Sequence, residues 1–263
     1  MGSLSTGDGL LLVGHGSRDV QGQAEFFELA AQIADAAGGQ PVEPCFLELA
    51  KPTIQQAVDR LAARGVHQLV VAPVVLFSAG HARRDIPDAV GAACQRHVGL
   101  TWRQAPPLGC HQQIVELSQR RFLAAQTQLP AAASQAQTLL IMVGRGSRDA
   151  EATAEMHRFV QRMVQRFSEL RTTTCFCAMA RPLLGETIRK IAEDAANRKS
   201  PFFQQTPGHF VVQPHLLFQG QLLADIHRQV AEVRAAHPLQ HWCVADPLGP
   251  ELEVSRAILD LVD

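Results

Sequence analysis

Residues 10–19 of this chain read LLLVGHGSRD, and this stretch decides the fold. Its apolar first half has the length and composition of a buried β-strand. The run stops at Gly14 and leads into a loop that begins with His15. Ligands of open α/β sheets bind at the carboxyl ends of the strands, so His15 lies where a functional site is expected.

The same pattern returns at residues 139–149 as LLIMVGRGSRD, with Arg145 in place of His15. Two further pairs of segments match in the same order: CFLELAKP (45–52) with CFCAMARP (175–182), and PVVLF…GHARRDI (73–86) with PHLLF…GQLLADI (214–226). Ordered matches of this kind indicate that the chain arose by internal duplication.

Length and composition are those of a globular protein of two ordinary domains. The chain has 263 residues, 46% of them hydrophobic, and a formal net charge of −1. A balanced charge offers no general attraction to nucleic acid or to a membrane surface, so we expect neither as a partner. The N-terminal residues lack the basic and apolar regions of a signal peptide, and the six cysteines form no CxxC pair. We therefore expect a cytoplasmic protein without a disulfide framework.

Apolar strand patterns alternate with helical patterns along the whole chain, which predicts an α/β fold with parallel sheets flanked by helices. The duplication predicts two similar lobes, residues 1–128 and 139–263. A polar connector that is rich in Ala and Gln, residues 129–138, joins them. Within the first lobe we expect a strand over 41–49, a helix opened by Pro52 at its first turn, and a helix from Asp85.

Three residues of the first lobe bear the chemistry of a metal or proton-transfer site. His15 and His81 follow two different strands, and Glu48 lies near the end of the strand between them in sequence. If these strands lie side by side, two imidazoles and a carboxylate meet at one edge of the sheet. Such a set suits a divalent first-row metal ion and also proton abstraction near neutral pH. The competing interpretation is two loop histidines with satisfied hydrogen bonds.

The second lobe favours the functional interpretation. At the three matching positions it has Arg145, Ala178 and Gln221, whereas Gly14 and Pro52 recur as glycine and proline. The polar groups therefore changed while residues that shape the backbone were kept. This pattern predicts a single site, in the first lobe.

Five further residues are candidates for binding a substrate. Ser17 and Arg18 recur in the second lobe, so Ser17 is equally a candidate for capping the first helix. Arg83 and Arg84 follow His81 and could hold carboxylates, although a solvated helix start would explain them as well. Ser78 lies in the same loop as His81.

Together, GHGSR, FLELAKP and PVVLFSAGHARRDIP resemble the sirohydrochlorin chelatases of the CbiX and SirB type, relatives of protoporphyrin ferrochelatase. The resemblance covers both halves, because long members of that family are fused duplications and short members are homodimers. It implies that His15 and His81 bind the metal and accept pyrrole protons, and that Glu48 assists. The implied reaction inserts cobalt or iron into sirohydrochlorin for sirohaem or cobalamin. The divalent ion, Co²⁺, Fe²⁺ or Ni²⁺, is then a substrate, and no permanently bound cofactor is implied.

Other functions remain open from the sequence. One is a protein that binds or delivers a tetrapyrrole or metal without turnover, and another is a ferrochelatase acting on a different porphyrin. A hydrolase using Ser17 is disfavoured, because the flanking residues lack the GxSxG turn. Since the two lobes are fused, we expect a monomer.

Overall fold

The computed structural model describes residues 7–77, 81–130, 134–199, 203 and 208–263. The chain divides into two compact units. Unit 1 comprises Met1–Ile114 and Gly249–Asp263, and unit 2 comprises Val115–Leu248. Each unit is built on a four-stranded parallel sheet, so the predicted α/β fold with two similar sheets is confirmed.

Unit 1 has the strand order β2-β1-β3-β4. All seven residues of β1 are buried, as its continuous apolar sequence predicts for a central parallel strand. The elements are β1 (Asp8–Gly14), α1 (Val20–Ala36), β2 (Val42–Phe46), α2 (Ile54–Ala63), β3 (Gln68–Pro73), the π-helical turn η1 (His81–Asp85), α3 (Ile86–Cys94), β4 (Thr101–Gln104) and α9 (Leu252–Val262).

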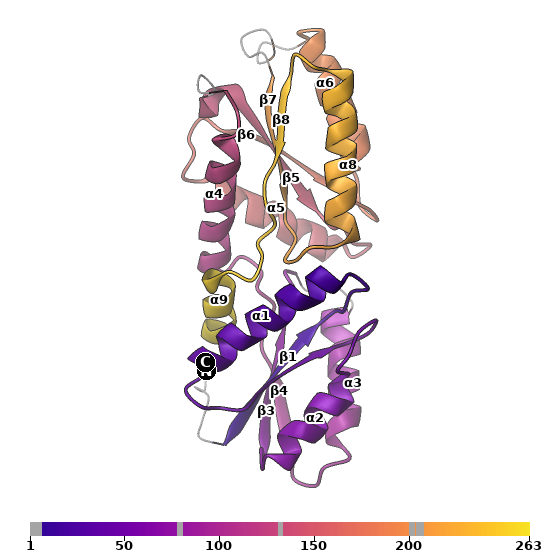
Figure 1. Ribbon diagram of the computed structural model, residues 1–263, viewed down its shortest axis with the longest axis vertical. Coiled ribbons are helices and arrows are strands. Elements are labelled where there is room, and N and C mark those ends of the chain that lie inside the picture. The colour runs from indigo at the N-terminus through magenta and orange to yellow at the C-terminus, as the bar shows by residue number, and fades with distance from the viewer. Residues whose placement is uncertain (1–6, 78–80, 131–133, 200–202, 204–207) are drawn as a thin grey trace. The chain divides into compact units, whose positions relative to one another are not determined.

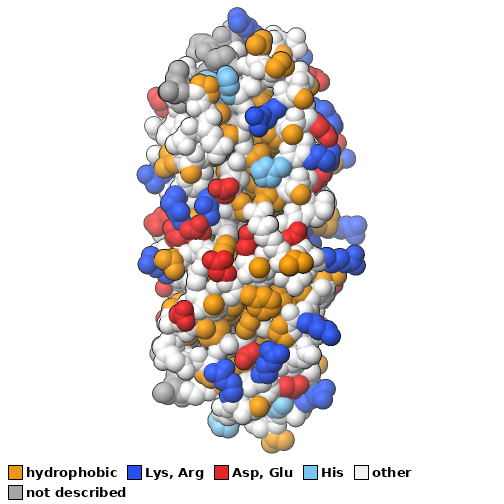
Figure 2. Space-filling model, in the orientation of Figure 1, with side chains coloured by type: hydrophobic (Ala, Val, Ile, Leu, Met, Phe, Trp, Pro, Cys, Tyr) orange, Lys and Arg blue, Asp and Glu red, His pale blue; other side chains and the backbone are white. Residues whose placement is uncertain are grey.

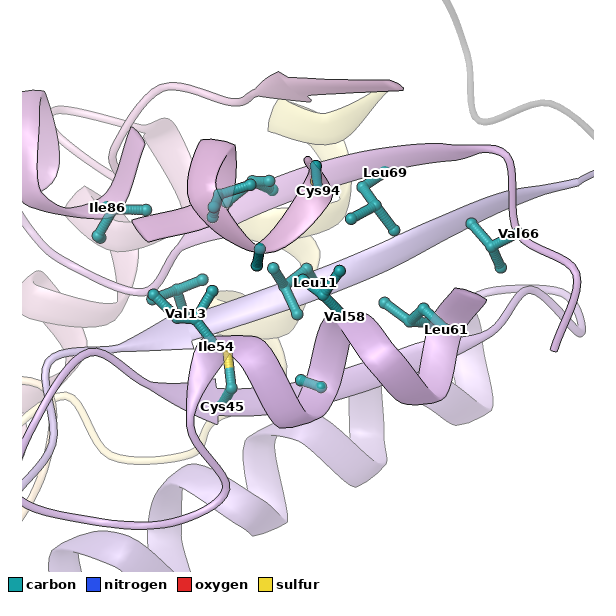
Figure 3. Packing of buried hydrophobic residues seen from close by; sticks show 14 residues of the cluster. Leu11, Val13, Cys45, Ile54, Val58, Leu61, Val66, Leu69, Ile86 and Cys94 are labelled. Carbon is teal, nitrogen blue, oxygen red and sulfur yellow. The ribbon is translucent and has the colours of Figure 1, made fainter. Parts of the chain in front are cut away.

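Helices cover both faces of this sheet (Figure 1). One face packs against α2 and α3, and Figure 3 shows Leu11 and Val13 of β1 beside Val58 and Ile54 of α2. The other face packs against α1 and α9, which contact each other. Both faces of the sheet are thus buried under helices. The loops that follow the parallel strands lie at the carboxyl edge of the sheet.

Unit 2 repeats this arrangement with the strand order β6-β5-β7-β8. Helices α6 and α8 cover one face, and α5 and α4 pack on the other. Its elements are α4 (Gln112–Gln126), the 3₁₀ turn η2 (Gln135–Gln137), β5 (Thr138–Gly144), α5 (Ala150–Val164), β6 (Arg171–Phe176), α6 (Leu184–Ala196), β7 (His209–Pro214), α8 (Gln221–Ala236) and β8 (His241–Val244).

The units differ from the predicted lobes, 1–128 and 139–263, at two helices. Most of α4 belongs to unit 2, where the Gln213 side chain donates to the Ser118 backbone oxygen at 2.8 Å. Helix α9 belongs to unit 1, where Ser255 Oγ lies 2.7 Å from Gln32 Oε1. Each helix buries its apolar side against the sheet of the unit that contains it, which decides its membership.

Two predicted element boundaries in unit 1 were wrong. Strand β2 ends at Phe46 and not at residue 49, so Glu48 lies in a loop. Pro52 does not open α2, because Thr53 is the N-cap: its hydroxyl accepts from the amide of Gln56, whose side chain accepts from the amide of Thr53. The helix expected from Asp85 is preceded by the π-helical turn η1.

Among the residues that the structure describes, no helix combines the length and the apolar character needed to cross a membrane. Side chains of both charges are interspersed over the face seen in Figure 2, in keeping with the net charge of −1.

Candidate active site

The candidate site is built at the carboxyl edge of the unit 1 sheet. His15 directly follows β1, whose neighbours are β2 on one side and β3 on the other. Gly14 pairs with Phe46 of β2, and Val13 pairs with Pro73 of β3. The three strands therefore lie side by side, with β1 in the middle, which is the condition for these residues to meet at one edge.

Backbone contacts join the loop after β1 to the loop after β2. The Leu47 amide donates to the Gly14 carbonyl at 2.9 Å, and the Glu48 amide donates to the His15 carbonyl at 3.1 Å. Gly16 has φ +101°, and a Cβ there would lie 1.7 Å from the carbonyl oxygen of Glu48. Only glycine permits this approach, which fixes the position of Glu48 relative to His15.

The side chains of His15 and Glu48 meet above this junction. His15 Nε2 lies 3.2 Å from Glu48 Oε1, and the two side chains are 29% and 50% exposed. A neutral imidazole that donates from Nε2 keeps its lone pair on Nδ1, which is the form that binds a metal ion or accepts a proton. The carboxylate can take a proton from the ring and release it to water, because half of its surface is open to solvent.

Unit 2 contains the same backbone junction with different side chains. The Cys177 amide donates to the Gly144 carbonyl at 2.9 Å, and the Ala178 amide donates to the Arg145 carbonyl at 3.0 Å. A Cβ on Gly146, where φ is +89°, would lie 1.8 Å from the Ala178 oxygen. Arg145 and Ala178 thus occupy the backbone positions of His15 and Glu48, as the sequence alignment predicts.

Ser17 has a local role that the sequence did not predict. Its Oγ accepts from the amide of Asp19 at 3.0 Å, and Ser147 accepts from Asp149 in the same way at 3.0 Å. Ser17 does not cap α1, one of the two roles that the sequence left open for it, because Asp19 is the N-cap and its carboxylate accepts from the amide of Gly22. This shared turn explains why the serine recurs in both repeats. Arg18 is exposed at the same loop.

The remaining candidates follow β3, the neighbour of β1. Ser78 lies outside the described residues. His81 begins η1, and its side chain is outside the described part of the structure. Arg83 and Arg84 lie in the same turn and are exposed. Among the side chains that are described, no three His, Cys, Asp or Glu residues gather as a metal site.

Leu49 also lies at the site, although the sequence did not single it out. It has φ +64° and is 52% exposed, directly after Glu48. Its counterpart Met179 has φ +60° and is 51% exposed. A left-handed backbone at a large apolar residue is unusual, and nothing in a single sequence reveals it. The repeat offers the one clue, since both copies place a large apolar residue at this point.

A profile of the CbiX family matches residues 9–125 and again residues 139–263. The chain belongs to the CbiX family. A sirohydrochlorin cobaltochelatase of Priestia megaterium is 27% identical over 93% of this chain and 76% of its own length. A sirohydrochlorin ferrochelatase of the same organism is 28% identical over 92% of this chain and 84% of its own length.

Solved structures support the fold of this CbiX family member. The structure of SirB from Bacillus subtilis with Fe³⁺ matches with a TM-score of 0.80 and 23% identity, covering 98% of this chain and 94% of that one. SirB from Bacillus subtilis subspecies spizizenii in complex with cobalt matches with a TM-score of 0.78 and 22% identity, over the same shares of the two chains. At this level of identity the likeness establishes the fold of both repeats.

Proposed function

We propose that this chain inserts a divalent metal ion, cobalt or iron, into sirohydrochlorin, at one site in the first repeat. The observation that carries the proposal is the His15–Glu48 pair, 3.2 Å apart, on a junction that holds Arg145 and Ala178 in the second repeat. The cobaltochelatase and ferrochelatase activities of the family's relatives give the reaction class.

The reaction needs a weakly held metal ion and a path for two protons. As the ion enters the macrocycle, two pyrrole N–H groups lose their protons. We assign metal binding to His15 and His81, since neutral imidazoles bind divalent first-row ions. Two such ligands alone hold the ion weakly enough to release it to the macrocycle. Once the ion has left them, His15 and His81 can each take one of these protons, and the proton on His15 passes on to Glu48, which meets solvent. The metal is a substrate, and the proposal needs no resident cofactor.

Cationic and hydroxyl groups around the same loops would hold the macrocycle. Sirohydrochlorin carries several carboxylates, and Arg18, Arg83 and Arg84 are exposed on the two loops that follow β1 and β3. Charge-assisted hydrogen bonds from guanidinium groups to carboxylates are stronger than neutral ones. We assign Ser17 and Ser78 to the same binding surface. In this assignment the arginines affect substrate affinity, whereas His15, His81 and Glu48 affect turnover.

We further propose a cytoplasmic monomer. The six cysteines are free, and most of them are buried, which fits a reducing compartment. Both repeats are already present in one chain, so a second chain is not needed to supply the second fold. Sedimentation velocity at several protein concentrations tests the monomer, and a constant sedimentation coefficient is the expected result.

An anaerobic absorbance assay tests the activity. The purified chain is mixed with sirohydrochlorin and Co²⁺, Fe²⁺ or Ni²⁺ in turn, beside a protein-free control. We expect metal insertion to be much faster than in the control for cobalt or iron. His15→Ala should abolish the acceleration, whereas Arg145→Ala, at the matching position of the second repeat, should keep turnover and at most raise KM.

Two outcomes would contradict the proposal. Rates equal to the protein-free control for every metal would leave a protein that binds a tetrapyrrole or metal without turnover. Loss of turnover in Arg145→Ala together with full activity in His15→Ala would move the catalytic site to the second repeat.

A further inference from the structure

Two imidazoles lie side by side at the amino-terminal edge of the unit 2 sheet. His209 is the first residue of β7 and pairs in register with His241, the first residue of β8. Their ring centroids are 5.4 Å apart, with 30° between the ring planes. The loop that carries Arg145 follows the opposite edge of this sheet. A six-residue strand spans about 20 Å, so the pair is separate from that loop.

The two rings differ in their access to solvent. His209 is only 5% exposed, and its Nδ1 has no hydrogen-bond partner among the described residues. His241 is exposed at the surface. Leaving a buried polar atom without a partner is destabilising, so its presence calls for a compensating contact. A cation bound at an imidazole lone pair is such a contact.

The fold does not itself require histidines at these positions. In unit 1, the strands β3 and β4 begin with Gln68 paired with Thr101 in the same register. That sheet forms with an amide and a hydroxyl where unit 2 has two imidazoles. The histidine pair is therefore a property of the second repeat, which lacks the His15 and Glu48 counterparts.

We propose that His209 and His241 bind a divalent first-row transition metal ion, with water completing its coordination. Imidazole nitrogens bind such ions at about 2 Å, which places the centres of two rings on one ion about 5 Å apart. The observed separation is close to this value. Imidazole ligands suit cobalt, nickel, zinc and copper, whereas magnesium and calcium prefer oxygen. The site is independent of the proposed chelatase activity.

Binding of Co²⁺ and Ni²⁺ alone, followed by calorimetry on the full chain, tests the site. The starting variant carries His15→Ala and His81→Ala, so that the proposed active site contributes nothing. We expect it to bind one ion. Adding His209→Gln and His241→Thr, the residues that unit 1 has at these positions, should remove that binding. His97→Gln, which changes a partly exposed histidine of unit 1, should keep it.

A measurement on the unmutated chain guards against misfolded variants. Paramagnetic Co²⁺ should broaden the ring NMR signals of His209 and His241, together with those of any histidines at the proposed active site. Because His241 is exposed, the single variant His241→Thr should keep the fold. The ring signal that is missing from the spectrum of this variant is then that of His241. Metal binding that survives His209→Gln/His241→Thr, or unbroadened signals of both rings at saturating Co²⁺, would overturn the proposal.

Discussion

Gly16 and Gly146 show how single residues position the side chains of the site. Each lets its loop approach a carbonyl oxygen so closely that a Cβ would lie 1.7 Å or 1.8 Å from it. The side chains that follow from this geometry differ between the repeats, since one junction holds His15 with Glu48 and the other holds Arg145. The glycine thus serves the backbone, and the chemistry depends on its neighbours.

Replacing Gly16 with alanine should destabilise the protein by about 2–4 kcal/mol, because the new Cβ overlaps backbone and cannot be relieved by a side-chain rotation. Gly99→Ala is the matched control, since Gly99 also has positive φ, +82°, but has open space around its Cβ position. Left-handed strain alone costs about 1–2 kcal/mol. Urea unfolding followed by circular dichroism measures both losses, and equal losses would show that the close approach is unimportant.

A buried histidine should make the stability of unit 2 depend on pH. Burial lowers the pKa of His215 to about 3, whereas an unfolded histidine titrates near 6.5. Between these values the unfolded chain binds more protons than the folded one, so stability falls as pH falls. From pH 7 to pH 5 the loss due to this one group is about 2 kcal/mol.

His215→Val should remove this part of the pH dependence, because valine is the residue that unit 1 has at the equivalent position, Val74. Both amides donate to the neighbouring central strand, to Val143 and Val13 respectively. The measurement is the free energy of unfolding at pH 7 and pH 5, with the exposed His227→Gln as control. An unchanged pH dependence in His215→Val would show that another group is responsible.

At the scale of elements, α9 shows that distant parts of the chain complete one core. This last helix buries Val254, Ile258 and Val262 within unit 1. Its Val262 carbonyl accepts from the Arg103 guanidinium, and the Pro250 carbonyl before it accepts from the Gln32 side chain at 2.7 Å. The stability of the N-terminal sheet therefore depends on the C-terminal residues.

Ile258→Ala should destabilise unit 1 by about 2–4 kcal/mol, since Ile258 is 2% exposed and its loss leaves a cavity. The chain has two tryptophans, Trp102 in β4 of unit 1 and Trp242 in β8 of unit 2. In a Trp242→Phe background, the fluorescence of Trp102 should show that Ile258→Ala lowers the denaturant concentration at which unit 1 unfolds. In a Trp102→Phe background, the fluorescence of Trp242 should show that the unfolding of unit 2 is unchanged. The reverse result would place α9 with unit 2.

The order of strands and helices could be predicted from the sequence, because continuous apolar runs mark buried parallel strands and the repeat confirms each one. The ends of the elements were less predictable: β2 stops at Phe46, although the next two amides still donate to the carbonyls of Gly14 and His15. The sequence also did not predict which sheet α4 and α9 cover, since an apolar helix face can pack against either sheet. At the site, comparison of the two repeats singled out His15 and Glu48, whereas the left-handed backbone at Leu49 is marked only by a large apolar residue at the same point of both copies.

For the whole molecule, the two repeats and the two units do not coincide. The first repeat supplies most of α4 to unit 2, and the second repeat supplies α9 to unit 1. A single repeat cut from the chain therefore has a sheet that lacks one covering helix and a helix that lacks its sheet. Two copies of that fragment could complete each other by exchanging the helix, which is a closed and symmetric arrangement.

Residues 1–130 expressed alone should accordingly form a dimer, in which α4 of each copy covers the sheet of the other. The buried side of α4 drives this association, and Phe122, which is fully buried and contacts Phe167 in unit 2, is part of it. Phe122→Asp should dissociate the dimer and expose the uncovered sheet, whereas Arg120→Ala on the exposed side of α4 should leave it intact. Sedimentation equilibrium distinguishes these cases. A folded monomer of residues 1–130 would show instead that α4 can pack against the sheet of its own repeat. The placement of α4 in unit 2 would then be a consequence of fusing the repeats.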